Sequence, residues 1–228
     1  MEETEVCFLM DRFGYMKLID KNAFERNKEA ACQENKYVFT CMNTDKICIF
    51  TDTGRMHTIK AADIPLVRFR DKGVPADNLS NYDSASEQML YVAPVSRIRE
   101  SMLLFVTRTS MCKQVEGAEF DVSKRTIAST KLSEGDSLIF VGDAAEMEQV
   151  VLQSRDGYFL RFPKTEISVM KKTAVGVRGM KLSGEDGLEH AYLLGGHQEY
   201  TITCHDKPYA LNKIRLAKRD TKGVKPRI

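Results

Sequence analysis

The sequence predicts an all-β protein, a propeller-like array of five blades with roughly four strands in each. Three observations predict this fold: an internal repeat of strand, turn and strand, repeat spacings typical of propeller blades, and strands that are apolar on both faces. The chain has 228 residues, of which 43% are hydrophobic and 29% are charged. This composition supports a buried core, and we expect one domain over residues 1–228.

The repeat consists of an apolar run, a short polar turn that usually ends in Gly, and a second apolar run. In the first copy, residues 6–10 lead through Gly14 to residues 15–19. The five turns end at residues 14, 54, 110, 157 and 208, so the periods are 40, 56, 47 and 51 residues. Glycine permits the positive φ of a tight hairpin turn. We therefore expect hairpins near residues 4–24, 46–64, 101–120, 147–167 and 199–216, the last copy being the weakest.

Further strand-like runs lie between the hairpins, at residues 37–42, 89–92, 137–141 and 191–194. Most of the runs, such as 7–10 and 103–106, are apolar on both faces. One face of a sandwich sheet is usually wet, whereas a radial blade is covered on both sides by its neighbours. We therefore favour a circular array over the alternative, an irregular β-sandwich with coincidental spacing. Only short helical pieces are expected, at residues 22–32, 61–66 and 144–147.

Positive charge is concentrated at one position of the repeat. Four segments that follow the second strands, 68–72, 124–131, 171–181 and 218–227, contain 15 basic and 2 acidic residues, against 19 basic and 30 acidic elsewhere. In a ring, these segments would form a broken positive belt that suits duplex DNA, because Lys and Arg bind phosphates without sequence preference. The expected DNA-binding residues are Arg68, Arg70, Lys72, Lys124, Arg125, Lys131, Lys171, Lys172, Arg178, Lys181, Lys218, Arg219, Lys222 and Lys225. Two alternatives are merely solvated loops and a propeller scaffold that docks an acidic protein.

Other functional classes find little support in the residues. No apolar run approaches the roughly 20 residues of a membrane-spanning helix, and the N-terminus does not resemble a secretory signal, so we expect a cytoplasmic protein without membrane contact. The six cysteines form no C-x-x-C pair and are expected to be reduced thiols. Phosphate-loop, serine-elbow and zinc-protease motifs are absent. His190, His197, Cys204 and His205 match no standard zinc spacing, so we expect neither metal nor cofactor.

Several phrases of the sequence resemble a known family. They are 14–17 (GYMK), 156–162 (DGYFLRF), 62–65 (ADIP) followed by 72–74 (KGV), and above all 176–182 (GVRGMKL). They resemble the C-terminal domain of the A subunit of bacterial type II topoisomerases, DNA gyrase and topoisomerase IV. The resemblance implies a five-bladed β-pinwheel whose blades exchange strands and whose basic edge binds and bends DNA in the nucleoid. It also implies that the cleavage tyrosine and the ATPase lie elsewhere, in a cleavage core and an ATPase subunit with which this domain works.

One departure from the gyrase pattern concerns the loop after the first hairpin. The A subunits of gyrases carry a Gln-Arg-Arg-Gly-Gly-Lys-Gly box there, whereas residues 25–34 read ERNKEAACQE, with no glycine and a net charge of −1. The sequence therefore looks more like the topoisomerase IV version, or like a divergent gyrase-like paralogue. This departure predicts DNA bending with little chiral wrapping.

Overall fold

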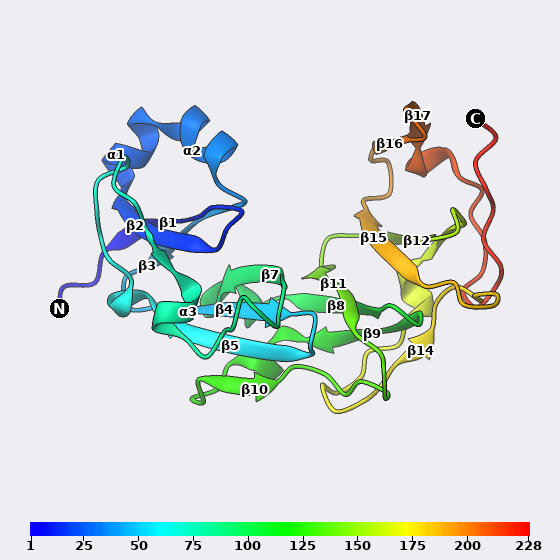
Figure 1. Ribbon diagram of the computed structural model, residues 1–228, viewed down its shortest axis with the longest axis horizontal. Helices are drawn as coiled ribbons and strands as arrows, with labels where there is room; N and C mark the ends of the chain where they lie inside the picture. The colour runs from blue at the N-terminus through cyan, green and yellow to red at the C-terminus, as the bar shows by residue number, and fades with distance from the viewer.

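Five antiparallel sheets follow one another around an open arc in the computed structural model, which describes residues 1–228 (Figure 1). Each sheet is built on one hairpin of the repeat. The blade with helices α1 and α2 lies at one end of the arc, and the two-stranded β16–β17 sheet lies at the other. The five blades therefore form a crescent, an arc that is left open between its two ends.

The strands, in their order within each sheet, are distributed over the five blades. Blade 1 contains β3 (Tyr37–Met42), β1 (Glu5–Met10), β2 (Tyr15–Asp20) and β6 (Val74–Pro75). Blade 2 contains β10 (Thr126–Ala128), β5 (Arg55–Lys60), β4 (Lys46–Thr51) and β7 (Met89–Pro94). Blade 3 contains β11 (Leu138–Asp143), β8 (Met102–Thr107), β9 (Met111–Glu116) and β14 (Val177–Arg178). Blade 4 contains β13 (Phe159–Pro163), β12 (Gln149–Ser154) and β15 (Leu188–Leu194), and blade 5 contains β16 (Thr201–Cys204) and β17 (Lys207–Ala210).

The hairpin turns use left-handed backbone conformations. Gly14, Gly54 and Gly157 have φ values of 84°, 76° and 90°, and Ser110 takes the same region at 74°. The fifth turn differs from the sequence expectation, because the positive φ values fall on His205 and Asp206 and β17 already begins at Lys207. A two-residue turn with both residues at positive φ matches the twist of its strands, so the turn closes there.

The central strands of the inner blades present their two faces to two different neighbouring blades. In β8, Leu103 and Phe105 pack with residues of β4 in blade 2, whereas Leu104 and Val106 pack with residues of β12 in blade 4. The same alternation holds for β4, whose odd-numbered residues face blade 1 and whose even-numbered residues face blade 3. Successive side chains of a strand point to opposite faces. β4 and β8 are therefore apolar along almost their whole length because both of their faces are buried.

Two short helices cover the face of blade 1 that points away from blade 2. They are α1 (Lys21–Arg26), whose first turn is capped by the Asp20 carboxylate at 2.8 Å from the Ala23 amide, and α2 (Lys28–Glu34). Ala23 and Ala31 pack against Cys7 and Leu9 of β1.

The remaining helices are α3 (Ala76–Leu79), α4 (Val95–Ile98) and the 3-10 helices η1 (Ala61–Asp63), η2 (Gly117–Phe120), η3 (Lys164–Glu166) and η4 (Leu211–Lys213). The helix expected at 144–147 is a turn, in which the Asp143 carboxylate accepts from the Ala145 amide at 3.0 Å. No helix is long and apolar enough to cross a lipid bilayer.

Candidate nucleic-acid interface

Four extended segments connect each blade to the one before it, and we call them straps. They are residues 64–73, 120–126, 167–176 and 214–223, and each follows one of the 3-10 helices η1 to η4. The first three straps lead into β6, β10 and β14, the fourth strands of blades 1, 2 and 3. The fourth strap leads to Val224, which bridges Phe159 of blade 4. The chain thus exchanges strands between neighbouring blades.

The straps run to the outer side of the arc. β3, β7, β11 and β15 form the opposite edges of their sheets and contact one another in sequence, so they line the inner side. β10 and β14 lie on the outer side of the crescent in Figure 1. The sequence-predicted positive belt is therefore carried by the convex rim.

Backbone hydrogen bonds hold the straps at equivalent places on the sheets they cross. Isolated parallel bridges pair Leu18 with Leu66, Gln114 with Val169, and Arg161 with Leu216. In the first of them, the Leu18 amide donates to the Pro65 carbonyl at 3.0 Å, and the Val67 amide donates to the Leu18 carbonyl at 2.9 Å. Corresponding strap residues thus occupy corresponding positions on the rim.

Basic side chains on the sheets anchor the straps from beneath. Lys113 is only 1% exposed, and its ammonium group donates to the carbonyls of Lys171, Lys172 and Ala174 at 3.3, 2.9 and 2.6 Å. Burial lowers the pKa of Lys113 to about 8, against the opposing effect of Glu119. The other anchors are Lys17 on Phe69 and Asp71, Lys46 on Val122, and Arg161 on Ile214. The strap backbones are therefore fixed before any ligand binds.

Twelve of the fourteen sequence-predicted site residues are exposed. Arg68, Arg70 and Lys72 lie on the first strap, Lys124 and Arg125 on the second, Lys171 on the third, and Lys218 and Lys222 on the fourth. Arg178 is in β14, and Lys131, Lys181 and Lys225 lie just beyond the outer strands. The structure thus places them all on, or next to, the four straps.

The other two, Lys172 and Arg219, are half-buried and bind the protein itself. The Lys172 ammonium donates to the Glu119 carbonyl at 3.0 Å, and the Arg219 guanidinium donates to the carbonyls of Glu166 and Arg178 at 2.9 and 2.7 Å. Glu119 and Glu166 belong to η2 and η3. Lys172 therefore connects the third strap to η2, at the start of the second strap, and Arg219 connects the fourth strap to η3, at the start of the third.

Acidic residues on the rim pair with two of the predicted arginines. Arg68 contacts Asp71 at 3.1 Å, and Arg178 contacts Asp220. The hydrogen bond from Arg68 lowers the pKa of Asp71, and the one from Arg178 lowers the pKa of Asp220. All four side chains are at the surface, where such pairs contribute little to stability.

Tyrosines that follow two hairpin turns hold lysines of the rim. The Lys72 ammonium lies 4.6 Å from the ring centre of Tyr15, and those of Lys222 and Lys225 lie 5.1 and 5.0 Å from that of Tyr158. Stacking over an aromatic ring restricts a lysine without neutralising it. These contacts were not expected from the sequence, because each lysine lies far along the chain from its tyrosine.

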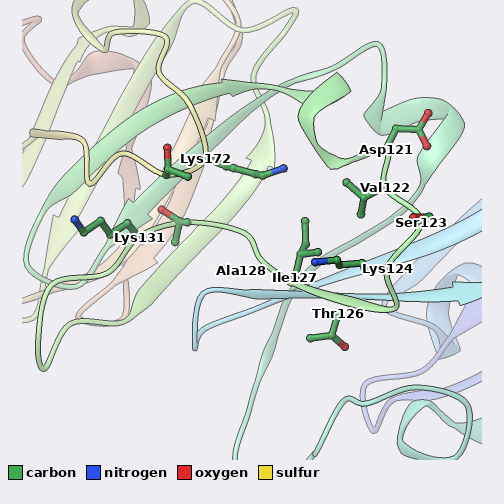
Figure 2. Close-up of a pocket in the computed structure, with 11 residues that line it drawn as sticks. Asp121, Val122, Ser123, Lys124, Thr126, Ile127, Ala128, Lys131 and Lys172 are labelled. Carbon is green, nitrogen blue, oxygen red and sulfur yellow. The ribbon is translucent and has the colours of Figure 1, made fainter.

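An open groove of about 1030 Å³ lies where the second and third straps approach each other (Figure 2). Lys124, Lys131 and Lys172 border it, together with Val122 and Ile127. Asp121 is the one acidic residue against these three lysines, so the groove is positively charged overall and has an apolar element.

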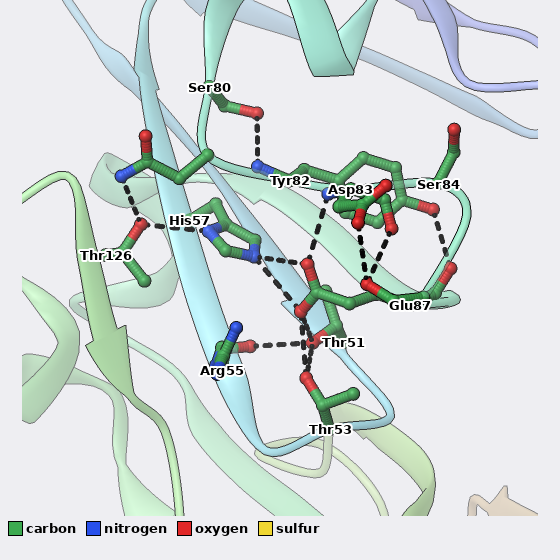
Figure 3. A network of polar contacts seen from close by, with 12 residues as sticks. Thr51, Thr53, Arg55, His57, Ser80, Tyr82, Asp83, Ser84, Glu87 and Thr126 are labelled. Carbon is green, nitrogen blue, oxygen red and sulfur yellow. Dashed lines mark hydrogen bonds and ion pairs between the residues drawn. The ribbon is translucent and has the colours of Figure 1, made fainter.

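A buried polar network fixes the end of the second strap (Figure 3). His57 bonds through Nδ1 to the Thr126 hydroxyl and through Nε2 to Glu87, both at 2.9 Å. Burial alone would raise the pKa of Glu87, but hydrogen bonds from Thr53, Thr51 and the Asp83 amide, with His57, lower it. His57 and Glu87 are 1% and 5% exposed, so the network lies inside the fold and holds the Thr126 end of the strap in place.

Comparisons with known proteins assign this architecture to a family. A family model described as the DNA gyrase C-terminal domain, beta-propeller, matches residues 45–85, 101–142 and 148–194. The chain belongs to this family. The predicted resemblance and the β-pinwheel fold class are thereby confirmed.

Solved structures and curated relatives agree with this assignment. The C-terminal domain of DNA topoisomerase IV superposes with a TM-score of 0.85 and 22% identity, covering 98% of this chain and 73% of that chain. The E. coli ParC C-terminal domain gives 0.77 at 16% identity, covering 98% and 94% of the two chains. The DNA gyrase A subunit of Salmonella typhimurium is 30% identical over 98% of this chain, and the DNA topoisomerase 4 A subunit of Streptococcus pneumoniae is 25% identical over 97%. The chain spans only 27% and 28% of these two relatives.

Proposed function

We propose that this domain of the gyrase C-terminal family binds duplex DNA along its convex rim and bends it, as an accessory domain of a type II topoisomerase. The observation that carries the proposal is the set of exposed cations on the four straps. One exposed cation occupies the same position in each strap. A buried apolar residue lies at the end of each 3-10 helix or directly after it, and the cation follows this residue by four positions. The four cations are Arg68, Lys124, Lys171 and Lys218. A rigid curved rim with a cation at each blade junction is complementary to a bent, regularly charged polyanion.

DNA bends on the rim if the contacts between cations and phosphates offset the elastic energy of bending the duplex. Bending 20–30 base pairs by 40–90° costs on the order of 1–6 kcal/mol. Each phosphate neutralised by Lys or Arg releases condensed counterions, which favours binding without reading the bases. Because anchors such as Lys113 already order the straps, little conformational entropy is lost when the rim binds DNA.

The whole enzyme supplies the partners in this proposal. The domain presents duplex DNA to a cleavage core that works with an ATPase subunit, on the nucleoid in the cytoplasm. The cleavage chemistry belongs to those other parts, and this domain contributes the geometry of the DNA.

The proposal predicts a steep salt dependence of binding. With contacts at four straps, the slope of log affinity against log salt should be roughly −4 to −8. Fluorescence anisotropy with mixed-sequence duplexes of increasing length measures it, and affinity should rise up to a few helical turns. A slope near zero, or weak attraction that does not depend on length, would instead favour a scaffold for an acidic protein.

A second prediction concerns the end of the rim at blade 1. Residues 25–34, which carry a net charge of −1, lie mainly in α1 and α2, outside the four straps. DNA should therefore leave the rim early at this end, so that the domain bends linear duplex but traps little writhe, as in the topoisomerase IV version of the fold. Relaxing a plasmid with saturating domain and measuring the linking-number shift tests this, with a box-containing gyrase domain alongside. A shift as large as that of the gyrase domain would show that the box is dispensable here.

A further inference from the structure

Each strap carries an aliphatic residue two positions before one of the four equivalent cations, Arg68, Lys124, Lys171 and Lys218. The aliphatic residues are Leu66, Val122, Val169 and Leu216. Leu66, Val169 and Leu216 are 62%, 53% and 48% exposed, although β-bridges to the sheet beneath fix their backbone. Val122 is half-buried and borders the groove of Figure 2.

The aliphatic residue and the cation point to the same side of the rim. In the first and third straps the backbone is extended around the aliphatic residue. The residues directly before and after it form backbone hydrogen bonds with a single strand residue, which is Leu18 for the first strap and Gln114 for the third. Residues two apart on an extended chain share a face and lie roughly 6.6 Å apart along it. In the first strap both members are open to solvent, since the Arg68 side chain is 89% exposed.

Single exposed aliphatic residues on a protein surface need no explanation. Here the same kind of side chain recurs at the same position of all four straps, each time beside a cation. Such a rim is complementary to a partner that alternates apolar and anionic groups at short spacing. The DNA backbone is such a partner, because it alternates phosphates with deoxyribose rings.

We propose that Leu66, Val169 and Leu216 pack against deoxyribose rings along the edge of the minor groove, while the cations two residues later bind the adjacent phosphates. The proposal rests on the DNA-binding function above and deepens it. The minor groove is about 6 Å wide and 7.5 Å deep, so a Val or Leu side chain on the strap reaches the sugars at its edge and not the base edges on its floor. The contacts therefore add affinity without sequence preference.

The test separates apolar contacts from charge contacts. The triple variant Leu66→Ala, Val169→Ala, Leu216→Ala keeps every charge, and its matched control is Phe13→Ala, which removes an exposed aromatic side chain from a hairpin turn outside the straps. Anisotropy with a mixed-sequence DNA duplex over a salt series is the readout. The triple variant should bind roughly five- to tenfold more weakly at every salt concentration, with the salt slope of the parent. The control should bind as the parent does.

A second arm uses an RNA duplex of the same sequence. Its minor groove displays polar 2′-hydroxyls on the sugars, so the parent should prefer DNA, and the triple variant should lose most of that preference. Equal binding of parent and triple variant to DNA would overturn the inference while leaving the proposed function intact. A loss accompanied by a shallower salt slope would also overturn it, because the side chains would then be acting through the cations. If the parent binds no duplex, the proposed function fails and the inference falls with it.

Discussion

Replacing Phe105 by alanine is expected to lower the free energy of unfolding by about 3–5 kcal/mol. Phe105 is 1% exposed in β8 and joins two blades and a strap. Its ring lies 6.0 Å from that of Phe50 in β4 and 5.7 Å from that of Phe120 in η2, where the second strap begins. Truncation removes this ring contact and leaves a cavity that three separate elements would have to close together.

Urea or thermal unfolding followed by circular dichroism measures the effect of Phe105→Ala. The matched control is Phe13→Ala, because Phe13 is 71% exposed, and its substitution should change stability by less than about 0.5 kcal/mol. A Phe105→Ala protein as stable as the control would mean that the blades are not packed against each other through this residue.

The sequence predicts the blades well, because the information for a hairpin is local. The turn residues Gly14, Gly54 and Gly157 and the apolar runs beside them are visible in the chain without knowledge of the fold. A strand that is apolar at every position also indicates that both of its faces are buried. In β8, each face is covered by a different blade.

Strand exchange and the open arc have no comparable local signal. β6 and β14 contain two residues each, and their pairing depends on where the straps lie in three dimensions. Only the family resemblance implied the exchange. The helical tendency of residues 22–32 was visible, but the face of blade 1 that they cover is decided by packing in three dimensions.

The candidate site was also predictable only in part. Charge clustering in the sequence located the straps, but it did not show that Lys171 differs in exposure from Lys172, or Lys218 from Arg219. In each pair the first residue is exposed and the second bonds to a neighbouring 3-10 helix. The exposed and the bonded cation can be distinguished because successive side chains of an extended strap point to opposite sides. The exposed cation lies on the same side as the aliphatic residue two positions before it.

Reversing the four equivalent cations together, Arg68→Glu, Lys124→Glu, Lys171→Glu and Lys218→Glu, is expected to weaken binding to duplex DNA by roughly 10²–10³-fold near physiological salt and to make the salt slope shallower by roughly 3–4. The slope changes because each lost phosphate contact removes about 0.9 from it. Lys172 and Arg219 stay unchanged in this variant, since they hold the straps in place. The free energy of unfolding should therefore change little, because the four substituted side chains are exposed.

The matched control reverses four exposed cations away from the straps, Arg12, Arg26, Lys28 and Lys36, to Glu. It produces the same change in formal charge as the strap variant, and it lies around blade 1 and its helices, where the DNA is expected to leave the rim. If the charge of the whole domain governed binding, both variants would lose affinity equally. If the straps form the interface, the control should lose far less affinity than the strap variant and should keep most of the parent's salt slope. Anisotropy titrations of parent, strap variant and control at three or more salt concentrations decide between these outcomes, and an equal loss in both variants would refute a rim built from the straps.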